Sequence, residues 1–322
     1  MQSNTVRWGV LGYARIARLN AIPAMQRAGN AELAAIASRD PAKLAECAGQ
    51  FPLARLHLKY EDLLADPDVD AIYVPLPNSL HKEWSIAALR AGKHVLCEKP
   101  LGMNAAEARE MAAVSRDTGK LLMEAFMYRY TDRMQRVREV IDSDVLGPLR
   151  HINASFRFFL DRPNTIKAKP ELGGGALYDV GCYPVNLLGL LTGEVPVRCE
   201  AVTEMELGVD VNLSALMQYD SGLIANIHCG FNAHGRMHAE VIGTLGVLEI
   251  ADTFLDAAGD IKLHTKEGTR SIAVAESDRY GAEFRDFSAA ILEGREPLLS
   301  LDETIRNLEV LDMIRASLNR KG

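Results

Sequence analysis

Short apolar runs in the first part of the chain alternate with segments whose apolar residues recur every three or four positions. The runs at 6–11, 33–37, 71–74 and 94–97 predict buried strands, and another extended run begins at Leu121. The segments between them predict amphipathic helices. Strands that alternate with helices at this spacing predict an α/β fold, with a doubly wound parallel sheet of the Rossmann type.

After about residue 125, apolar residues occupy every second position in consecutive runs, which predicts a sheet with one solvated face. We therefore expect two domains, residues 1–125 and residues 126–322, the second an α+β domain with a large, open, mainly antiparallel sheet. The final helix either covers this sheet or reaches back to the first domain. The predicted strands are 151–158, 197–206, 211–219, 222–231 and 236–243, and the predicted helices are 176–191 and 301–318.

Composition and charge narrow the class of protein. The formal net charge of the 322 residues is -7, which removes the usual electrostatic driving force for nucleic-acid binding. The five cysteines are scattered without a CxxC pair, so we predict neither a disulfide framework nor a catalytic metal site. We expect no signal peptide and no membrane span, and a reducing cytoplasm fits best.

A modified glycine fingerprint, Gly12-Tyr13-Ala14-Arg15-Ile16-Ala17, follows the first strand. Gly12 suits a tight turn, Ala14 allows a pyrophosphate to approach closely, and Ala17 allows the helix to pack tightly on the strand. Free N–H groups at the start of that helix then bind the phosphates. The alternative is a small strand–helix turn that holds no ligand.

Ser38 and Arg39 stand at the end of the second strand, where NAD enzymes carry Asp or Glu for the ribose hydroxyls. Arg39 can hold a 2′-phosphate with two hydrogen bonds, and Lys43 is placed to help it. Asp40 could instead serve as the acidic residue, and a solvated turn is a further alternative. We favour Arg39, and therefore NADP over NAD.

Two further segments lie where strands reach the carboxyl edge of the sheet, which is the edge that binds ligands. One is Glu98-Lys99-Pro100, and the other is Leu76-Pro77-Asn78 followed by His81. Lys99 beside a cofactor can donate a hydrogen bond to a carbonyl or hydroxyl oxygen. The alternatives are a surface role for Lys99 and a helix cap for His81.

A glycine run at 173–175 leads into a predicted helix that carries Asp179 and Tyr183 at positions i and i+4. One helical face therefore presents a carboxylate and a phenol together. A phenol can pass a proton to or from a substrate oxygen as hydride moves. Burial of Tyr183 for packing is the competing interpretation.

The chain resembles the glucose-fructose oxidoreductase, inositol dehydrogenase and MocA family over essentially its whole length. The resemblance rests on the turn at 12–17, on Pro77-Asn78 with His81, on residues 91–100 and on residues 173–183. Tyr183 at the end of the last motif fits the branch that contains dimeric dihydrodiol dehydrogenase, NADP-dependent xylose dehydrogenase, glucose-fructose oxidoreductase and sugar 3-ketoreductases.

The resemblance implies that Lys99 and Tyr183 flank the substrate carbon facing the nicotinamide, with Tyr183 as acid/base and Lys99 tuning it or binding the substrate hydroxyl. Asp179 would orient the substrate or the tyrosine, and Tyr280 would touch the cofactor. Met127 would face cofactor or substrate at the domain junction, and a plain hinge or core role is the alternative. The open sheet of the second domain would form a homodimer or homotetramer.

The expected function is hydride transfer between NADP(H) and a hydroxyl or carbonyl carbon of a sugar or sugar derivative. The alternatives are a dihydrodiol or other non-sugar alcohol dehydrogenase, a glucose-fructose oxidoreductase with tightly bound NADP, and a non-catalytic cofactor-binding sensor. The expected catalytic residues are Lys99, Tyr183 and Asp179. The expected cofactor-binding residues are Gly12, Tyr13, Ala14, Arg15, Ile16, Ser38, Arg39, Lys43, Leu76, Pro77, Asn78, His81, Glu98, Lys99, Met127 and Tyr280.

Overall fold

Residues 4–51, 54–161 and 165–320 are described by the structure, a computed structural model. The chain divides into two compact units. The first contains the residues up to Met127 together with Asp278–Thr304, and the second contains Tyr128–Ser277 together with the residues from Ile305 onward.

The first unit holds a six-stranded parallel sheet in the order β3-β2-β1-β4-β5-β6, which confirms the predicted Rossmann fold. Strand order reverses between β1 and β4, and this is the switch point where ligands of such sheets bind. The strands are β1 (Val6–Leu11), β2 (Ala31–Ala37), β3 (Arg55–His57), β4 (Ala71–Val74), β5 (His94–Glu98) and β6 (Leu122–Ala125). The helices are η1 (Ala17–Ala21), α1 (Ile22–Arg27), α2 (Pro41–Gln50), α3 (Tyr60–Leu64), η2 (Asn78–Leu80), α4 (His81–Arg90), α5 (Ala105–Thr118) and α8 (Arg279–Glu293).

The return of residues 278–304 to the first unit differs from the predicted division at residue 125. The reason is the apolar face of α8, which packs on β1. Trp8 is fully buried, lies edge-on to Phe284 with ring centroids 5.0 Å apart, and donates from its indole nitrogen to Ser288 Oγ at 3.1 Å. A buried aromatic pair of this kind stabilises the fold by burial and by its edge-to-face geometry.

Local sequence signals explain where the helices of this unit begin. Asp40 caps α2 by accepting hydrogen bonds from the amides of Ala42 and Lys43, and Asn104 caps α5 by accepting from the Glu107 amide at 2.9 Å. The helix after the first strand contains a π turn, in which the Ile22 amide donates to the Ala17 carbonyl. Pro23 follows directly and has no amide proton, so the regular pattern is interrupted at this point.

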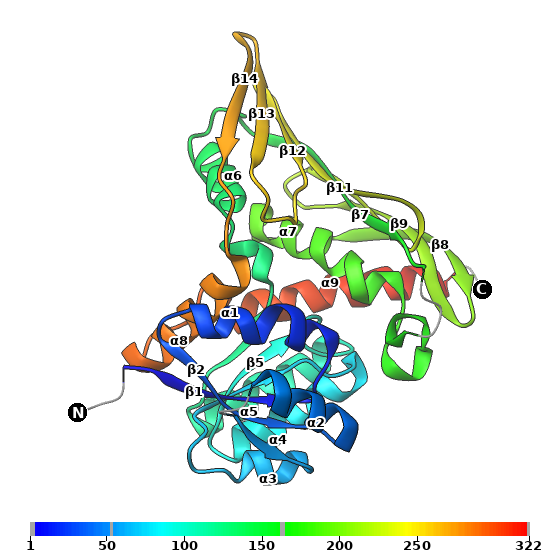
Figure 1. The fold of residues 1–322 in the computed structure, drawn as a ribbon. Helices are drawn as coiled ribbons and strands as arrows, with labels where there is room; N and C mark the ends of the chain where they lie inside the picture. The colour runs from blue at the N-terminus through cyan, green and yellow to red at the C-terminus, as the bar shows by residue number, and fades with distance from the viewer. Residues whose placement is uncertain (1–3, 52–53, 162–164, 321–322) are drawn as a thin grey trace. The chain divides into compact units, whose positions relative to one another are not determined.

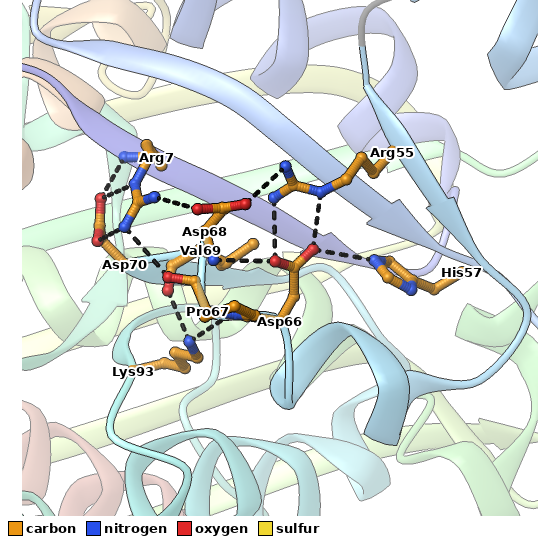
Figure 2. A network of polar contacts seen from close by, with 9 residues as sticks. All are labelled: Arg7, Arg55, His57, Asp66, Pro67, Asp68, Val69, Asp70 and Lys93. Atoms are coloured by element: carbon orange, nitrogen blue, oxygen red, sulfur yellow. Dashed lines mark hydrogen bonds and ion pairs between the residues drawn. The ribbon is translucent and has the colours of Figure 1, made fainter.

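A network of ion pairs and hydrogen bonds lies at the amino edge of the same sheet (Figure 2). Arg7 binds Asp70, with Nη2 and Oδ1 2.8 Å apart, and Arg55 binds Asp66, with Nε and Oδ2 2.9 Å apart. The buried ammonium of Lys93 donates to the carbonyl oxygens of Asp66 and Val69, both at 2.7 Å. These charged groups stabilise the loops at the end of the sheet opposite to the one where ligands bind.

The second unit holds an eight-stranded sheet in the order β14-β13-β12-β11-β7-β10-β9-β8, a single broad sheet in Figure 1. All pairs are antiparallel except β7 with β10, so the predicted open, mainly antiparallel sheet is confirmed. The strands are β7 (Leu149–Phe159), β8 (Arg198–Glu206), β9 (Val209–Gln218), β10 (Ile224–Gly230), β11 (Asn232–Gly243), β12 (Gly246–Ala251), β13 (Gly259–Thr265) and β14 (Gly268–Val274).

The helices of the second unit pack on this sheet and beside it. The α7 helix lies across β7 and β10, and α9 is held to β8 by a hydrogen bond from the Ala201 amide to Ser317 Oγ at 2.9 Å. The first four residues of α9 belong to the first unit and the rest to the second. The bounds are η3 (Met127–Tyr130), α6 (Asp132–Asp142), η4 (Ile166–Ala168), η5 (Pro170–Leu172), η6 (Leu177–Gly181), α7 (Cys182–Thr192) and α9 (Leu301–Asn319).

Candidate functional site

The turn after β1 has the geometry of a dinucleotide-binding turn. Gly12 has a φ of +90°, and its amide donates to the Ala37 carbonyl at 2.7 Å. A Cβ at this position would stand 3.1 Å from Leu76 Cδ2, so both the dihedral angle and the close packing favour glycine. The Tyr13 side chain is buried and donates to Gln50 Oε1 at 2.6 Å, which leaves only its backbone at the turn. The first amides of the following helix have no intrahelical acceptor.

The residues after β2 separate the roles of Arg39 and Asp40. Arg39 is exposed and stacks on Tyr60, with Cζ 5.0 Å from the ring centroid. Tyr60 in turn packs edge-on against Trp84. The Asp40 carboxylate is committed to the helix cap, because it accepts hydrogen bonds from the first amides of α2. The Arg39 guanidinium instead lies on an aromatic ring. The buried Ser38 hydroxyl accepts from the Asp40 amide at 3.2 Å.

A cluster of carboxyl and phenol groups lies at the ends of β4 and β5. Tyr73 donates to Glu98 Oε1 at 2.5 Å. Burial and then the charge of Glu98 raise the pKa of Tyr73, and Tyr280 of α8 adds to this effect. Glu283 of α8 is buried beside Glu98, and burial followed by this neighbouring charge raises its pKa well above the ordinary value. The structure thus brings Tyr280 to the same edge as Glu98, although 182 residues separate them in the sequence.

His81 lies between two backbone segments of the first unit. The ring is fully buried, with Nδ1 2.8 Å from the Pro100 carbonyl oxygen and Nε2 2.8 Å from the Leu76 carbonyl oxygen. Burial lowers the pKa of the ring, although both carbonyls favour the charged form. Because both nitrogens face backbone oxygens, His81 braces the loop after β4 against the turn that follows Lys99.

Glu124 at the end of β6 was missed by the sequence analysis. Its Oε1 accepts from the Leu101 amide at 2.8 Å, two residues after Lys99. Burial raises the pKa of this carboxyl to about 7, although the Lys99 ammonium and the Leu101 amide favour its ionised form. Nothing in the local pattern marks Glu124, because its partner Leu101 lies in the turn after the neighbouring strand β5, 23 residues earlier in the chain.

In the second unit, Asp179 and Tyr183 lie on η6 and α7. The Asp179 carboxylate forms an ion pair with Lys167, whose ammonium also stands over the Phe158 ring with Nζ 5.3 Å from its centroid. Tyr183 is 5% exposed and packs against Phe156 at 5.1 Å between ring centroids. The Tyr183 ring is therefore packed among aromatic side chains of its own unit.

Asn186, one turn beyond Tyr183, is a second residue that the sequence analysis missed. It is fully buried, and its Oδ1 accepts from Tyr128 OH at 2.6 Å and from Arg129 Nη1 at 3.3 Å. A buried amide that holds two side chains fixes their orientation. Its spacing of three residues from Tyr183 is the only signal in the sequence that could have found it.

The other predicted cofactor contacts occupy the carboxyl side of the first unit with varied exposure. Arg15 and Lys43 are exposed. Partly exposed residues are Ala14, Ile16, Pro77, Asn78, Glu98, Lys99, Met127 and Tyr280.

Comparison with known proteins identifies the class. Residues 6–126 match the model described as an oxidoreductase family with an NAD-binding Rossmann fold, and residues 134–249 match the GFO/IDH/MocA C-terminal domain. The chain is an NAD(P)-dependent oxidoreductase that acts on CH–OH or ketone groups. It belongs to the GFO/IDH/MocA family, as the resemblance predicted.

Relatives cover from three quarters of the chain to almost all of it. The D-xylose 1-dehydrogenase (NADP(+)) 2 of Haloferax volcanii is 37% identical over 316 residues, 96% of each protein. The trans-1,2-dihydrobenzene-1,2-diol dehydrogenase of Mus musculus is 35% identical over 76% of this chain and 74% of its own length. A 3-ketoreductase from Actinomadura kijaniata, solved with NADP and TDP-benzene, superposes with a TM-score of 0.92 at 32% identity over 98% of each chain.

No helix in the described ranges is both long and apolar enough to cross a membrane.

Proposed function

We propose that this protein transfers a hydride between NADP(H) and a hydroxyl or carbonyl carbon of a sugar or sugar derivative. The observation that carries the proposal is the full-length similarity to an NADP-dependent xylose dehydrogenase, which covers both units. The residue pattern after β2 supports the choice of cofactor, and the xylose dehydrogenase and the sugar 3-ketoreductase support a carbohydrate substrate.

The residues present fit a dinucleotide. Gly12 provides a turn that a Cβ would fill, and the start of the following helix offers amides to phosphate oxygens. Arg39 would hold the 2′-phosphate, because its guanidinium is exposed and stacked while Asp40 is committed to the α2 cap. When bound, the nicotinamide supplies or accepts the hydride.

Replacing Arg39 with alanine is expected to weaken NADPH binding by about 10- to 100-fold, because a charge-assisted hydrogen bond contributes about 1.5–3 kcal/mol. Affinity for NADH should stay within about twofold, since NADH has no 2′-phosphate. Fluorescence titration of both cofactors measures the two affinities. Arg90→Ala removes another exposed arginine of the same unit and serves as the control; equal NADPH affinity in wild type and Arg39→Ala would refute the assignment.

We propose that Tyr183 exchanges a proton with the substrate oxygen and that Lys99 donates a hydrogen bond to that oxygen. In the oxidative direction Tyr183, as the phenolate, would take the proton of the substrate hydroxyl and become the neutral phenol, while a bound NADP+ would accept the hydride. Asp179, paired with Lys167, would orient the sugar through its hydroxyl groups.

The substrate class is tested by measuring NADPH formation and consumption with aldoses, ketosugars and trans-dihydrodiols. The second candidate substrate is a non-sugar diol, because one relative is a dihydrodiol dehydrogenase. A preference for dihydrodiols of about tenfold or more in kcat/KM would replace the sugar proposal. Mass spectrometry of the cofactor that copurifies tests the third candidate, an enzyme that cycles a tightly bound NADP between two sugars.

We also propose that the open face of the second sheet joins subunits. Burial alternates along β8 and β9, so that Ala201 and Ala215 are buried while Val202 is 61% and Leu216 is 53% exposed. Exposed apolar side chains on adjacent strands are typical of a subunit interface.

Leu216→Arg is expected to convert a dimer or tetramer into a smaller species, because it places an unpaired charge in that interface. Light scattering after size-exclusion chromatography measures the mass in solution. Leu292→Arg, at a leucine of the first unit that is 44% exposed, is the matched control. A wild-type monomer, or an unchanged mass for Leu216→Arg, would contradict this interface.

A further inference from the structure

Asp210 of β9 lies directly beneath the start of the helix that carries Asp179 and Tyr183. Its Oδ2 accepts a hydrogen bond from the Leu177 amide at 2.6 Å. A Cβ on Gly175 would stand 2.2 Å from Asp210 Oδ1, which is far inside contact distance. Gly175 also has a φ of +113°, a conformation that L side chains rarely adopt. The third glycine of the run is therefore needed for the close approach of this carboxylate.

The charge of Asp210 matches its position. A helix start carries partial positive charge, and the amides of Ala176 and Leu177 both favour the ionised carboxylate. The Arg315 guanidinium of α9 acts in the same direction. Burial favours the neutral carboxyl more strongly than these groups favour the ionised carboxylate. The pKa of Asp210 therefore rises to about 6.

Two further titratable groups that Asp210 affects come from η6 and β10. Tyr178, whose phenol is bound to Arg315, and the buried thiol of Cys229 both have raised pKa values, to which the Asp210 charge contributes. Neither group is ionised near neutral pH. Of these three groups, Asp210 is therefore the one whose charge changes near pH 6.

We infer that Asp210 is a positioning residue for the reaction: its carboxylate fixes the first turn of the helix and so orients Asp179 and Tyr183 toward the substrate. The inference rests on the proposed roles of those two residues. Protonation of Asp210 weakens the hold on the Leu177 amide, because a neutral carboxyl is a poorer acceptor than a carboxylate. Turnover should therefore fall as the pH falls through about 6.

The sign of the stability effect separates this role from a merely structural one. The pKa of Asp210 is higher in the folded protein than its ordinary value of 3.8. Its contribution to the free energy of unfolding is therefore full below the unfolded pKa and is lost as the pH rises through about 6. At pH 8 the buried, ionised carboxylate lowers the free energy of unfolding. Asp210→Asn is therefore expected to unfold at the wild-type temperature or above it.

The test compares wild type, Asp210→Asn and Asp220→Asn, the last at an exposed aspartate of the same unit. Asp210→Asn should lower kcat by about 10- to 100-fold, because small displacements of reacting groups have effects of this size. It should also remove the decline of activity near pH 6 and leave NADPH affinity unchanged. Wild-type kcat in Asp210→Asn, or an unchanged pH profile with a lowered unfolding temperature at pH 8, would overturn the inference.

Hydrogen exchange gives a readout that does not depend on the substrate. At pH 8, amides in the peptide covering 176–183 should exchange at least about tenfold faster in Asp210→Asn than in wild type and Asp220→Asn. Unchanged exchange would overturn the inference even if the enzyme is active. If exchange is faster in Asp210→Asn and Tyr183→Phe is fully active, then Asp210 does fix the first turn of the helix, but the proposed function of Tyr183 is refuted.

Discussion

Tyr183→Phe is expected to lower kcat by about 10²- to 10⁴-fold while the protein stays folded. The range is that of a general acid/base in a proton transfer. Phenylalanine keeps the aromatic ring that packs against Phe156 and Phe254, so the substitution removes only the hydroxyl. Steady-state kinetics with the best substrate of the panel, in both directions, measures the effect.

The control for this variant is Tyr219→Phe, which removes the hydroxyl of another buried tyrosine in the second unit. We expect it to keep kcat within about twofold, since Tyr219 has no proposed contact with substrate. Unfolding temperature and NADPH affinity are measured on both variants. If Tyr183→Phe retains wild-type turnover across the whole panel, then packing is the complete role of Tyr183 and another group moves the proton.

Lys99→Met is expected to lower kcat/KM by about 10²- to 10⁴-fold, because it removes the ammonium proposed to bind the substrate oxygen while keeping a side chain of similar length. The loss should fall on kcat more than on KM if the hydrogen bond strengthens as charge develops on that oxygen. The same change removes a positive charge that holds down the pKa of Glu124, so this pKa should rise above about 7.

Lys120→Met is the matched control, at a partly exposed lysine of the same unit that lies near the amino end of β6. Its kinetics should equal those of wild type. If Lys99 only lies on the surface, Lys99→Met should also show wild-type kinetics. That outcome would mean that Lys99 has no part in the mechanism.

The double variant tests whether the two groups act in one step. If Lys99 and Tyr183 serve the same proton transfer, the loss in Lys99→Met with Tyr183→Phe should be well below the product of the single losses. A multiplicative loss would mean that the two residues act independently.

Much of the first unit could be predicted because its signals are local. The apolar runs predicted five of the six strands of the parallel sheet, and only the three-residue β3 was not foreseen. Asp40 and Asn104 cap their helices through amides two or three residues away, so the signal for each cap lies in neighbouring residues. Gly12 was recognisable as a turn for the same reason.

The second unit was predictable where strands alternate cleanly and less so where they do not. The hairpin between β9 and β10 turns at Asp220-Ser221-Gly222, a local turn signal, and Gly222 has a φ of +82°. The strands β12 to β14 were not foreseen.

By itself, therefore, the sequence determined the two kinds of sheet, the dinucleotide turn and the family, because periodicity, caps and motifs are properties of neighbouring residues. Tertiary structure alone decided that α8 returns to the first unit with Tyr280, that His81 braces two backbone carbonyls, and that Asp210 lies beneath Gly175. Each of these depends on burial and on partners far apart in the chain, and pairings of that kind leave no periodic pattern in either segment.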